Sequence, residues 1–114
     1  MREPSRDKGR LEDMVCYAEN VIAFMEGITF EEFISNKLLY FAVLKNVEII
    51  GEAAYMLSLT FKNTHPELPW NEIIAMRHVL VHGYSNISDR NLWFTATEDI
   101  LPLKKQVEEY LKNM

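Results

Sequence analysis

The stretch of sequence that decides the fold runs from Asn36 to Leu59 and reads NKLLYFAVLKNVEIIGEAAYMLSL. Its apolar residues cover more than one stripe of a helix, which predicts a helix buried on most sides, by the core and by a partner chain. Gly51 lies in the middle of this helix, where a glycine costs about 1 kcal/mol relative to alanine. We therefore expect Gly51 and the two alanines after it to let another helix approach closely.

Helices are also predicted on both sides of this stretch, because apolar residues recur there at spacings of three and four. Thr29 and Glu32 have the order of a capping box, which predicts a short helical turn. Pro102 removes one helical hydrogen bond and predicts a kink in the last helix. The other expected segments are a helix over Ser5–Glu26 that stops at Gly27, a loop over Phe61–Pro69, a helix from Pro69 to Gly83, and a helix from Ser88 or Asp89 to Leu111.

No alternating run typical of a strand is present, so residues 1–114 are expected to form one all-α domain, an antiparallel bundle of four to five helices. The net charge of −5 argues against broad binding to nucleic acid, which needs many Lys and Arg side chains, so any RNA contact should be local or shared with a second subunit. The single cysteine, the absence of a signal-peptide pattern and the absence of a long apolar run indicate a cytoplasmic protein without a membrane segment. We expect Cys16 to be half-buried and inert, and His65 to be solvated in its loop.

Polar chemistry is concentrated in residues 77–84, which read RHVLVHGY. His78 and His82 are four residues apart and could face one metal ion, but no acid or cysteine beside them completes a ligand shell, so no metal is expected. A second interpretation is cleavage of RNA through its own 2′-hydroxyl without a metal. His82 would then handle the proton, and Arg77 would stabilise the charge that builds on the phosphorane.

A third interpretation is structural, and the residues alone leave it as well supported as catalysis. Arg77 would pair with Glu48 or Glu52, while His82 and Tyr84 would cap the end of the helix. On an ideal helix the side chains of Arg77 and His82 diverge by roughly 140°. Joint action on one phosphate therefore requires the helix to unwind near His82 or a second subunit to contribute.

The motif itself resembles a known family. Arg77, His82 and Tyr84 match the R-x4-H-x-Y motif of HEPN-domain ribonucleases, specifically the HepT-like toxins of prokaryotic toxin–antitoxin pairs. Residues 45–54 resemble the second-helix signature of this family, and residues 68–77 resemble the run that leads into its catalytic arginine. With family-like residues at 92–93 and 99–102, the similarity covers residues 11–111. His78 stands where the family often has Asn or Asp.

The resemblance implies a helical homodimer in which Arg77 and His82 of both subunits line a shared cleft and cut RNA without metal or cofactor. His78, Glu48 and Glu52 are accessory candidates. It also implies a minimal nucleotidyltransferase antitoxin that transfers AMP from ATP onto Tyr84, where a bulky anion would fill the cleft and repel phosphate. The alternatives are a catalytically silent helical subunit that binds such a nucleotidyltransferase, which the acidic balance favours, and a purely structural dimer.

Overall fold

The computed structural model describes residues 4–78 and 88–114, and every element in these ranges is helical, as predicted. The side chains of Pro4 and His78 lie outside this description. In chain order the elements are η1 (Pro4–Arg6), α1 (Asp7–Met25), α2 (Phe30–Ser35), α3 (Lys37–Met56), α4 (Leu59–Thr64), α5 (Trp70–Ala75), η2 (Met76–His78), α7 (Asp89–Phe94), η4 (Thr95–Asp99) and α8 (Ile100–Lys112).

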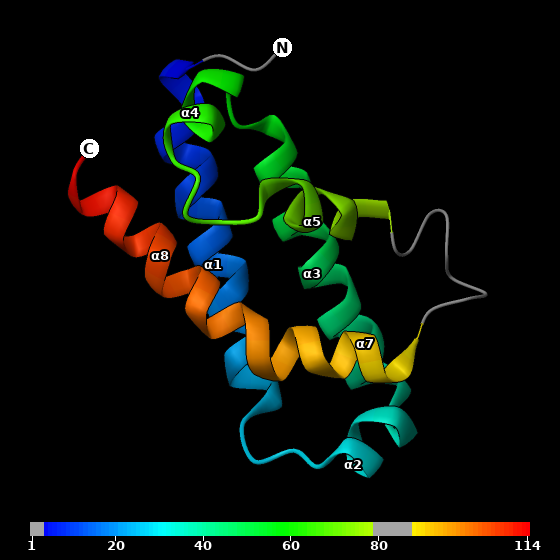
Figure 1. Cartoon of the computed structure of the whole chain (residues 1–114). Helices are drawn as coiled ribbons and strands as arrows, with labels where there is room; N and C mark the ends of the chain where they lie inside the picture. Colours follow the sequence, from blue (N-terminus) through cyan, green and yellow to red (C-terminus); the bar gives the residue numbers. More distant parts are fainter. Residues whose placement is uncertain (1–3, 79–87) are drawn as a thin grey trace.

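Three long helices form the body of the molecule. Helix α1 packs against both α3 and α8 and runs antiparallel to each of them (Figure 1). Burying a Leu, Ile or Val side chain contributes about 1.5–3 kcal/mol, so the apolar stripes predicted from the sequence hold these helices together. The largest fully buried side chains are Leu11, Met14, Val21, Phe33, Val43, Leu44, Val47, Ile50, Leu57, Ile100 and Val107.

Helix α3 is covered unevenly. From Val43 onward most of its apolar residues enter the core, but near its N-terminal end Leu38 is 85% exposed and Phe41 is 53% exposed. The core of this chain therefore covers only part of the apolar surface of α3. Coverage of the remaining part by a partner chain stays a prediction.

The predicted helix ends are confirmed at several positions. The Thr29 hydroxyl accepts a hydrogen bond from the Glu32 backbone N–H at 3.1 Å, and the Glu32 carboxylate accepts one from the Thr29 N–H at 2.9 Å. The Asn36 side chain caps α3, and the Ser88 hydroxyl caps α7. Gly27 follows α1 with a φ of 72°, a left-handed conformation that favours glycine.

One segment prediction is wrong, and a second is tested only over part of its length. The loop expected over Phe61–Pro69 begins as the last turns of α4, because the Ser58 hydroxyl accepts from the Phe61 N–H and starts a helix there. Of the helix expected from Pro69 to Gly83, the described residues are α helix over Trp70–Ala75 and the 3₁₀ turn η2 over Met76–His78. Residues 79–87, which include Gly83, lie outside the described part of the chain.

The solvent exposure of Cys16 and of His65 also differs from the prediction. Cys16 is exposed and not half-buried, because it lies beside the apolar stripe of α1 and not on it. His65 is partly buried, and its ring stacks on Phe61 with 3.9 Å between the ring centroids. The edge of this stack meets Tyr110 from α8, so His65 packs between α4 and α8.

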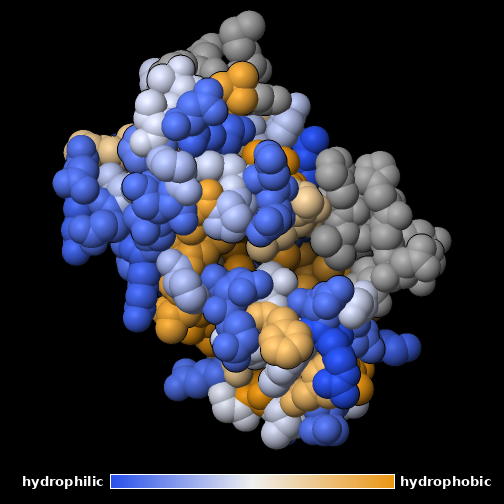
Figure 2. All heavy atoms as spheres, viewed as in Figure 1, coloured by the Kyte–Doolittle hydropathy of each residue, from blue (hydrophilic) through white to orange (hydrophobic). Residues whose placement is uncertain are grey.

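The last helical run changes its winding before Pro102. Thr95–Asp99 is a π-helical turn in which the Ile100 N–H donates to the Thr95 carbonyl oxygen, and the run bends where this turn meets α8 (Figure 1). The kink predicted at Pro102 is thus accommodated by a wider turn just before the proline. A hollow of about 260 Å³ lies between α5 and α8, beside this wide turn. On the face of the molecule seen in Figure 2, apolar residues lie in the centre and hydrophilic side chains border them.

Candidate active site around Arg77

The site begins with the close approach of η2 to α3. A Cβ atom added to Gly51 would lie 2.5 Å from the Arg77 backbone nitrogen and 2.9 Å from the Ile73 carbonyl oxygen. Both contacts are to backbone, which cannot move aside as a flexible side chain can. Gly51 therefore allows the close approach that the sequence predicts, and the segment that it admits is the one that carries Arg77.

The guanidinium of Arg77 is held between two side chains of α3. Its central carbon lies 3.6 Å from the centroid of the Tyr55 ring, a distance at which the ring face attracts a cation. One terminal nitrogen lies 3.5 Å from a carboxylate oxygen of Glu52, so the prediction that one of the two acids pairs with Arg77 is confirmed. These contacts fix the direction in which the arginine points.

Arg77 is held without being fully neutralised. Its side chain is 24% exposed, whereas that of Glu52 is 54% exposed, so the ion pair is open to solvent on the carboxylate side. The buried Nε atom has no hydrogen-bond partner among the residues that the structure describes. A positioned cation with an incomplete set of partners is chemically suited to receive an anion such as phosphate.

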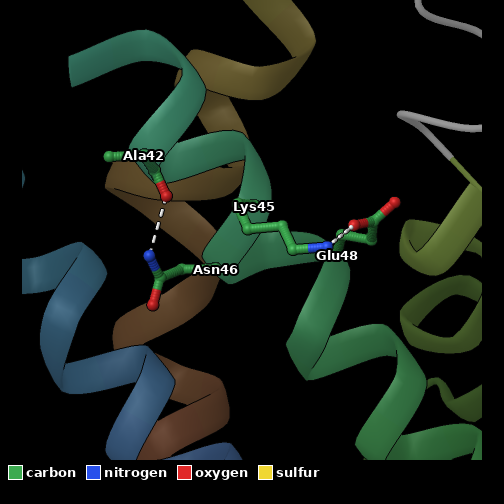
Figure 3. Close-up of polar contacts among 4 residues, drawn as sticks. All are labelled: Ala42, Lys45, Asn46 and Glu48. Carbon is green, nitrogen blue, oxygen red and sulfur yellow. Dashed lines mark hydrogen bonds and ion pairs between the residues drawn. The ribbon is translucent and has the colours of Figure 1, made fainter. Parts of the chain in front are cut away.

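Glu48 lies one turn before Glu52 and has a different partner. Its carboxylate accepts a hydrogen bond from the Lys45 ammonium at 2.9 Å, along the surface of α3 (Figure 3). Glu48 is buried while the Lys45 side chain is 60% exposed. Lys45, Glu48 and Glu52 are spaced at three and four residues, so a single stripe of charges leads along α3 to Arg77.

The neighbouring Asn46 ties this part of α3 to the core helices. Its amide donates to the Ala42 carbonyl oxygen at 2.7 Å (Figure 3), and its amide oxygen accepts from Asn20 of α1 at 3.0 Å. The charged stripe therefore projects from a helix whose opposite side is fixed by polar as well as apolar contacts.

The other predicted site residues are only partly described. The backbone of His78 belongs to η2, but its side chain lies outside the description, and His82 and Tyr84 fall in residues 79–87, also outside it. Whether they converge with Arg77 stays a prediction. Within residues 4–78 and 88–114, no group of three or more His, Cys, Asp or Glu side chains is placed to hold a metal ion.

Sequence reasoning missed Tyr55 as a site residue. The available signal was its position three residues after Glu52, which puts both side chains on one face of α3, together with the tendency of arginine to stack on aromatic rings. Lys45 was missed as well, although it lies in the stretch that resembles the family signature.

The fold and this site define an all-helical protein with a positioned arginine near one end of its central helices. Comparison with family models gives the more specific assignment. The model described as "Ribonuclease HepT-like" matches residues 14–110, and the chain belongs to this HepT-like ribonuclease family.

Curated relatives agree with this assignment over nearly their whole length. The chain is 42% identical to "Probable ribonuclease HepT" of Thermococcus cleftensis over 105 residues, which cover 92% of this chain and 96% of the relative. It is 39% identical to "Putative RNase MJ1380" of Methanocaldococcus jannaschii over 101 residues, 89% of this chain and 93% of the relative. It is 38% identical to "Putative RNase TTE0752" of Caldanaerobacter subterraneus over 102 residues, 90% of this chain and 91% of the relative.

A search of the solved structures gave no significant match. Among the described residues, none of the helices combines the length and the apolar character needed to cross a membrane.

Proposed function

We propose that this chain is the toxin of a prokaryotic toxin–antitoxin pair and acts as a metal-independent endoribonuclease on cytoplasmic RNA. The observation that carries the proposal is the guanidinium of Arg77, held on the Tyr55 ring and paired incompletely with Glu52. Family membership and the names of the relatives support the same reaction class. The exposed edge of the guanidinium would meet the scissile phosphate.

The reaction requires a proton transfer and charge stabilisation. The 2′-hydroxyl loses its proton to a base, its oxygen forms a bond to phosphorus, and the bond from phosphorus to the 5′-oxygen breaks as that oxygen gains a proton. His82 serves as the proton-transfer residue, and Arg77 stabilises the charge on the phosphorane. The products are a 2′,3′-cyclic phosphate and a 5′-hydroxyl.

The proposed active unit is a homodimer. The exposed Leu38 and Phe41 of α3 give the chain an apolar surface that a second copy would cover. A shared cleft would supply Arg77 and His82 from both subunits, and it would concentrate positive charge that an acidic monomer lacks. His78 and Glu48 are accessory candidates within this cleft.

Tyr84 is the proposed control point. A minimal nucleotidyltransferase antitoxin would transfer AMP from ATP onto its phenol, with pyrophosphate as the leaving group. The added phosphate would compete with RNA for Arg77 and close the cleft. Intact-mass measurement of the protein co-expressed with such an antitoxin would detect each added AMP.

The central test is cleavage of single-stranded RNA by the purified protein with and without a chelator. Arg77→Ala and His82→Ala should each abolish cleavage, and the chelator should have no effect. Arg90→Ala is the matched control, because Arg90 also lies over an aromatic ring, 4.7 Å from the centroid of Phe30. Equal cleavage by all variants would remove catalysis from Arg77 and His82.

The same assay addresses the alternative of a catalytically silent binding subunit, which the net charge of −5 favours. That alternative predicts a stable complex with the nucleotidyltransferase and no RNA cleavage at any protein concentration. Cleavage that disappears in both variants at unchanged fold would reject it.

A further inference from the structure

A groove next to the Arg77 site has no role in the proposed reaction. It lies between the C-terminal end of α3, helix α4 and helix α5, and its volume is about 560 Å³. It is lined by Tyr55, Leu59, Lys62, Asn63, Pro66, Leu68, Trp70, Asn71 and Ile74. One of these residues, Tyr55, is also the ring on which the Arg77 guanidinium rests.

Tyr55 thus joins the groove to the place where the scissile phosphate would bind. The ring is half-buried, with the guanidinium 3.6 Å from its centroid, and it also contributes to the groove wall. A nucleotide whose phosphate contacts Arg77 would have its base or its neighbour's base within reach of this wall. The groove and the proposed active site therefore share Tyr55.

The walls of the groove are built firmly. The Lys62 ammonium, although buried, donates to the carbonyl oxygens of Ala54 and Tyr55 at 3.3 and 3.4 Å. The Trp70 indole N–H donates to the His65 carbonyl oxygen at 2.7 Å. These bonds connect the end of α3, the segment after α4 and the start of α5, so the groove has a defined shape.

Two exposed amides complete the lining. Asn63 lies in the last turn of α4, and Asn71 lies in the first turn of α5. An amide side chain carries both a donor and an acceptor, which is the pattern that reads the edge of a nucleobase. Aromatic and apolar walls with a few amides are typical of sites for unpaired bases, which stack on rings and use their edges for hydrogen bonds.

We propose that this groove is a base-binding subsite that receives an unpaired nucleobase next to the scissile phosphate of single-stranded RNA and sets the nucleotide preference of the enzyme. The proposal rests on the proposed ribonuclease function for the identity of the ligand. Asn63 and Asn71 are the specificity-determining residues, and Tyr55 forms part of the wall against which the base packs.

The two tryptophans of the chain allow a direct test. Trp70 lines the groove, whereas Trp93 packs on Phe30 and Phe33. The variant Trp93→Phe leaves Trp70 as the sole reporter of the groove, and Trp70→Phe leaves Trp93 as the counterpart. Each is titrated with trinucleotides of A, C, G or U that carry 2′-O-methyl groups and cannot be cleaved, and with an abasic trinucleotide.

Base-containing trinucleotides should quench Trp70 emission and bind about tenfold more tightly than the abasic one, with one base preferred. Asn63→Ala combined with Asn71→Ala should remove the preference among bases, and Asn113→Ala, at the end of α8, should keep it. Equal binding of the abasic trinucleotide, quenching confined to Trp93, or an unchanged preference in the double variant would each overturn the proposal.

The experiment separates this inference from the proposed function because it requires no cleavage. Base-dependent quenching of Trp70 in a protein that cuts no RNA would support the base-binding subsite and reject the proposed ribonuclease function. RNA cleavage by a protein whose Trp70 emission does not depend on the base would support the ribonuclease function and reject the base-binding subsite.

Discussion

Gly51 and Arg77 are in such close contact that a methyl group on the former would lie 2.5 Å from the backbone nitrogen of the latter. The contact couples the packing of the central helix to the position of the arginine on which the proposed chemistry depends. It also makes the glycine testable by the smallest possible substitution.

Gly51→Ala should lower the free energy of unfolding by about 1–3 kcal/mol, because overpacking against backbone outweighs the gain of about 1 kcal/mol in helix propensity. Chemical denaturation measures this change. Gly9→Ala in α1 is the control, since a Cβ there meets nothing within 4 Å and should stabilise the protein. Two equally stabilised variants would show that η2 does not press on Gly51.

The Tyr55 ring should matter for cleavage through its face and not through its hydroxyl. Tyr55→Leu should lower the single-turnover rate constant of cleavage about tenfold, because a desolvated contact between a cation and a ring contributes up to about 2 kcal/mol. Tyr55→Phe keeps the ring and should stay within about threefold of the parent protein. The comparison is a single-turnover assay on one RNA, and equal loss in both variants would assign the role to the hydroxyl.

Glu52 should compete with RNA for Arg77. Its ion pair is long, at 3.5 Å, and half-exposed, so Glu52→Gln should change stability by less than about 1 kcal/mol. The variant should bind RNA more tightly, because a negative charge next to the phosphate site is removed. A KM that rises, or a kcat that falls more than tenfold, would instead make Glu52 a positioning residue.

A buried polar contact far from the site should contribute to stability alone. The Asp7 carboxylate accepts from the Ser58 backbone N–H at 2.8 Å and from its hydroxyl at 2.7 Å, which joins the start of α1 to the start of α4. Asp7→Ala should cost about 1.5–3 kcal/mol, and Ser58→Ala should cost less. The double variant should cost less than the sum of the two, with cleavage retained after correction for folded protein.

Stability should fall at alkaline pH because of two tyrosines. Burial, together with hydrogen bonds to Asp89 and Glu67 respectively, raises the pKa of Tyr40 and of Tyr110. The unfolded chain then loses these protons first, so their contribution is fully present below pH about 10 and is lost as the pH rises from there towards the folded pKa.

Tyr40→Phe should reduce the slope of unfolding free energy against pH above about 10, and adding Tyr110→Phe should reduce it further. Urea titrations between pH 8 and 11 measure this slope. An unchanged slope in the double variant would mean that other groups cause the alkaline loss.

The helical class and the close approach at Gly51 could be predicted because they follow from local pattern and from the cost of an unexplained glycine. Helix α4 could not be placed from periodicity, since six residues are too few to show it, although Ser58 was a usable capping signal. His65 and Cys16 were misjudged because their exposure depends on neighbours that are distant in sequence, such as Tyr110.

For the site, the pairing of Arg77 with an acid of α3 could be predicted from the charges alone. The choice of Glu52 over Glu48 as the partner of Arg77 could not be predicted. Glu48 forms an ion pair with Lys45, and only the three-dimensional structure shows this pair. Tyr55 was missed because contacts between a cation and a ring leave no fixed spacing in sequence.

The π-helical turn at Thr95–Asp99 holds one residue more than an α-helical turn would need. Because an α helix rotates by about 100° per residue, four residues in α winding cover about the same rotation as the five residues of this wide turn. Deletion of one residue from the turn should therefore restore ordinary winding and leave Leu103 and Val107 on the buried side of α8. The wide turn thus lets the segment absorb a change of one residue in length without rotating the last helix.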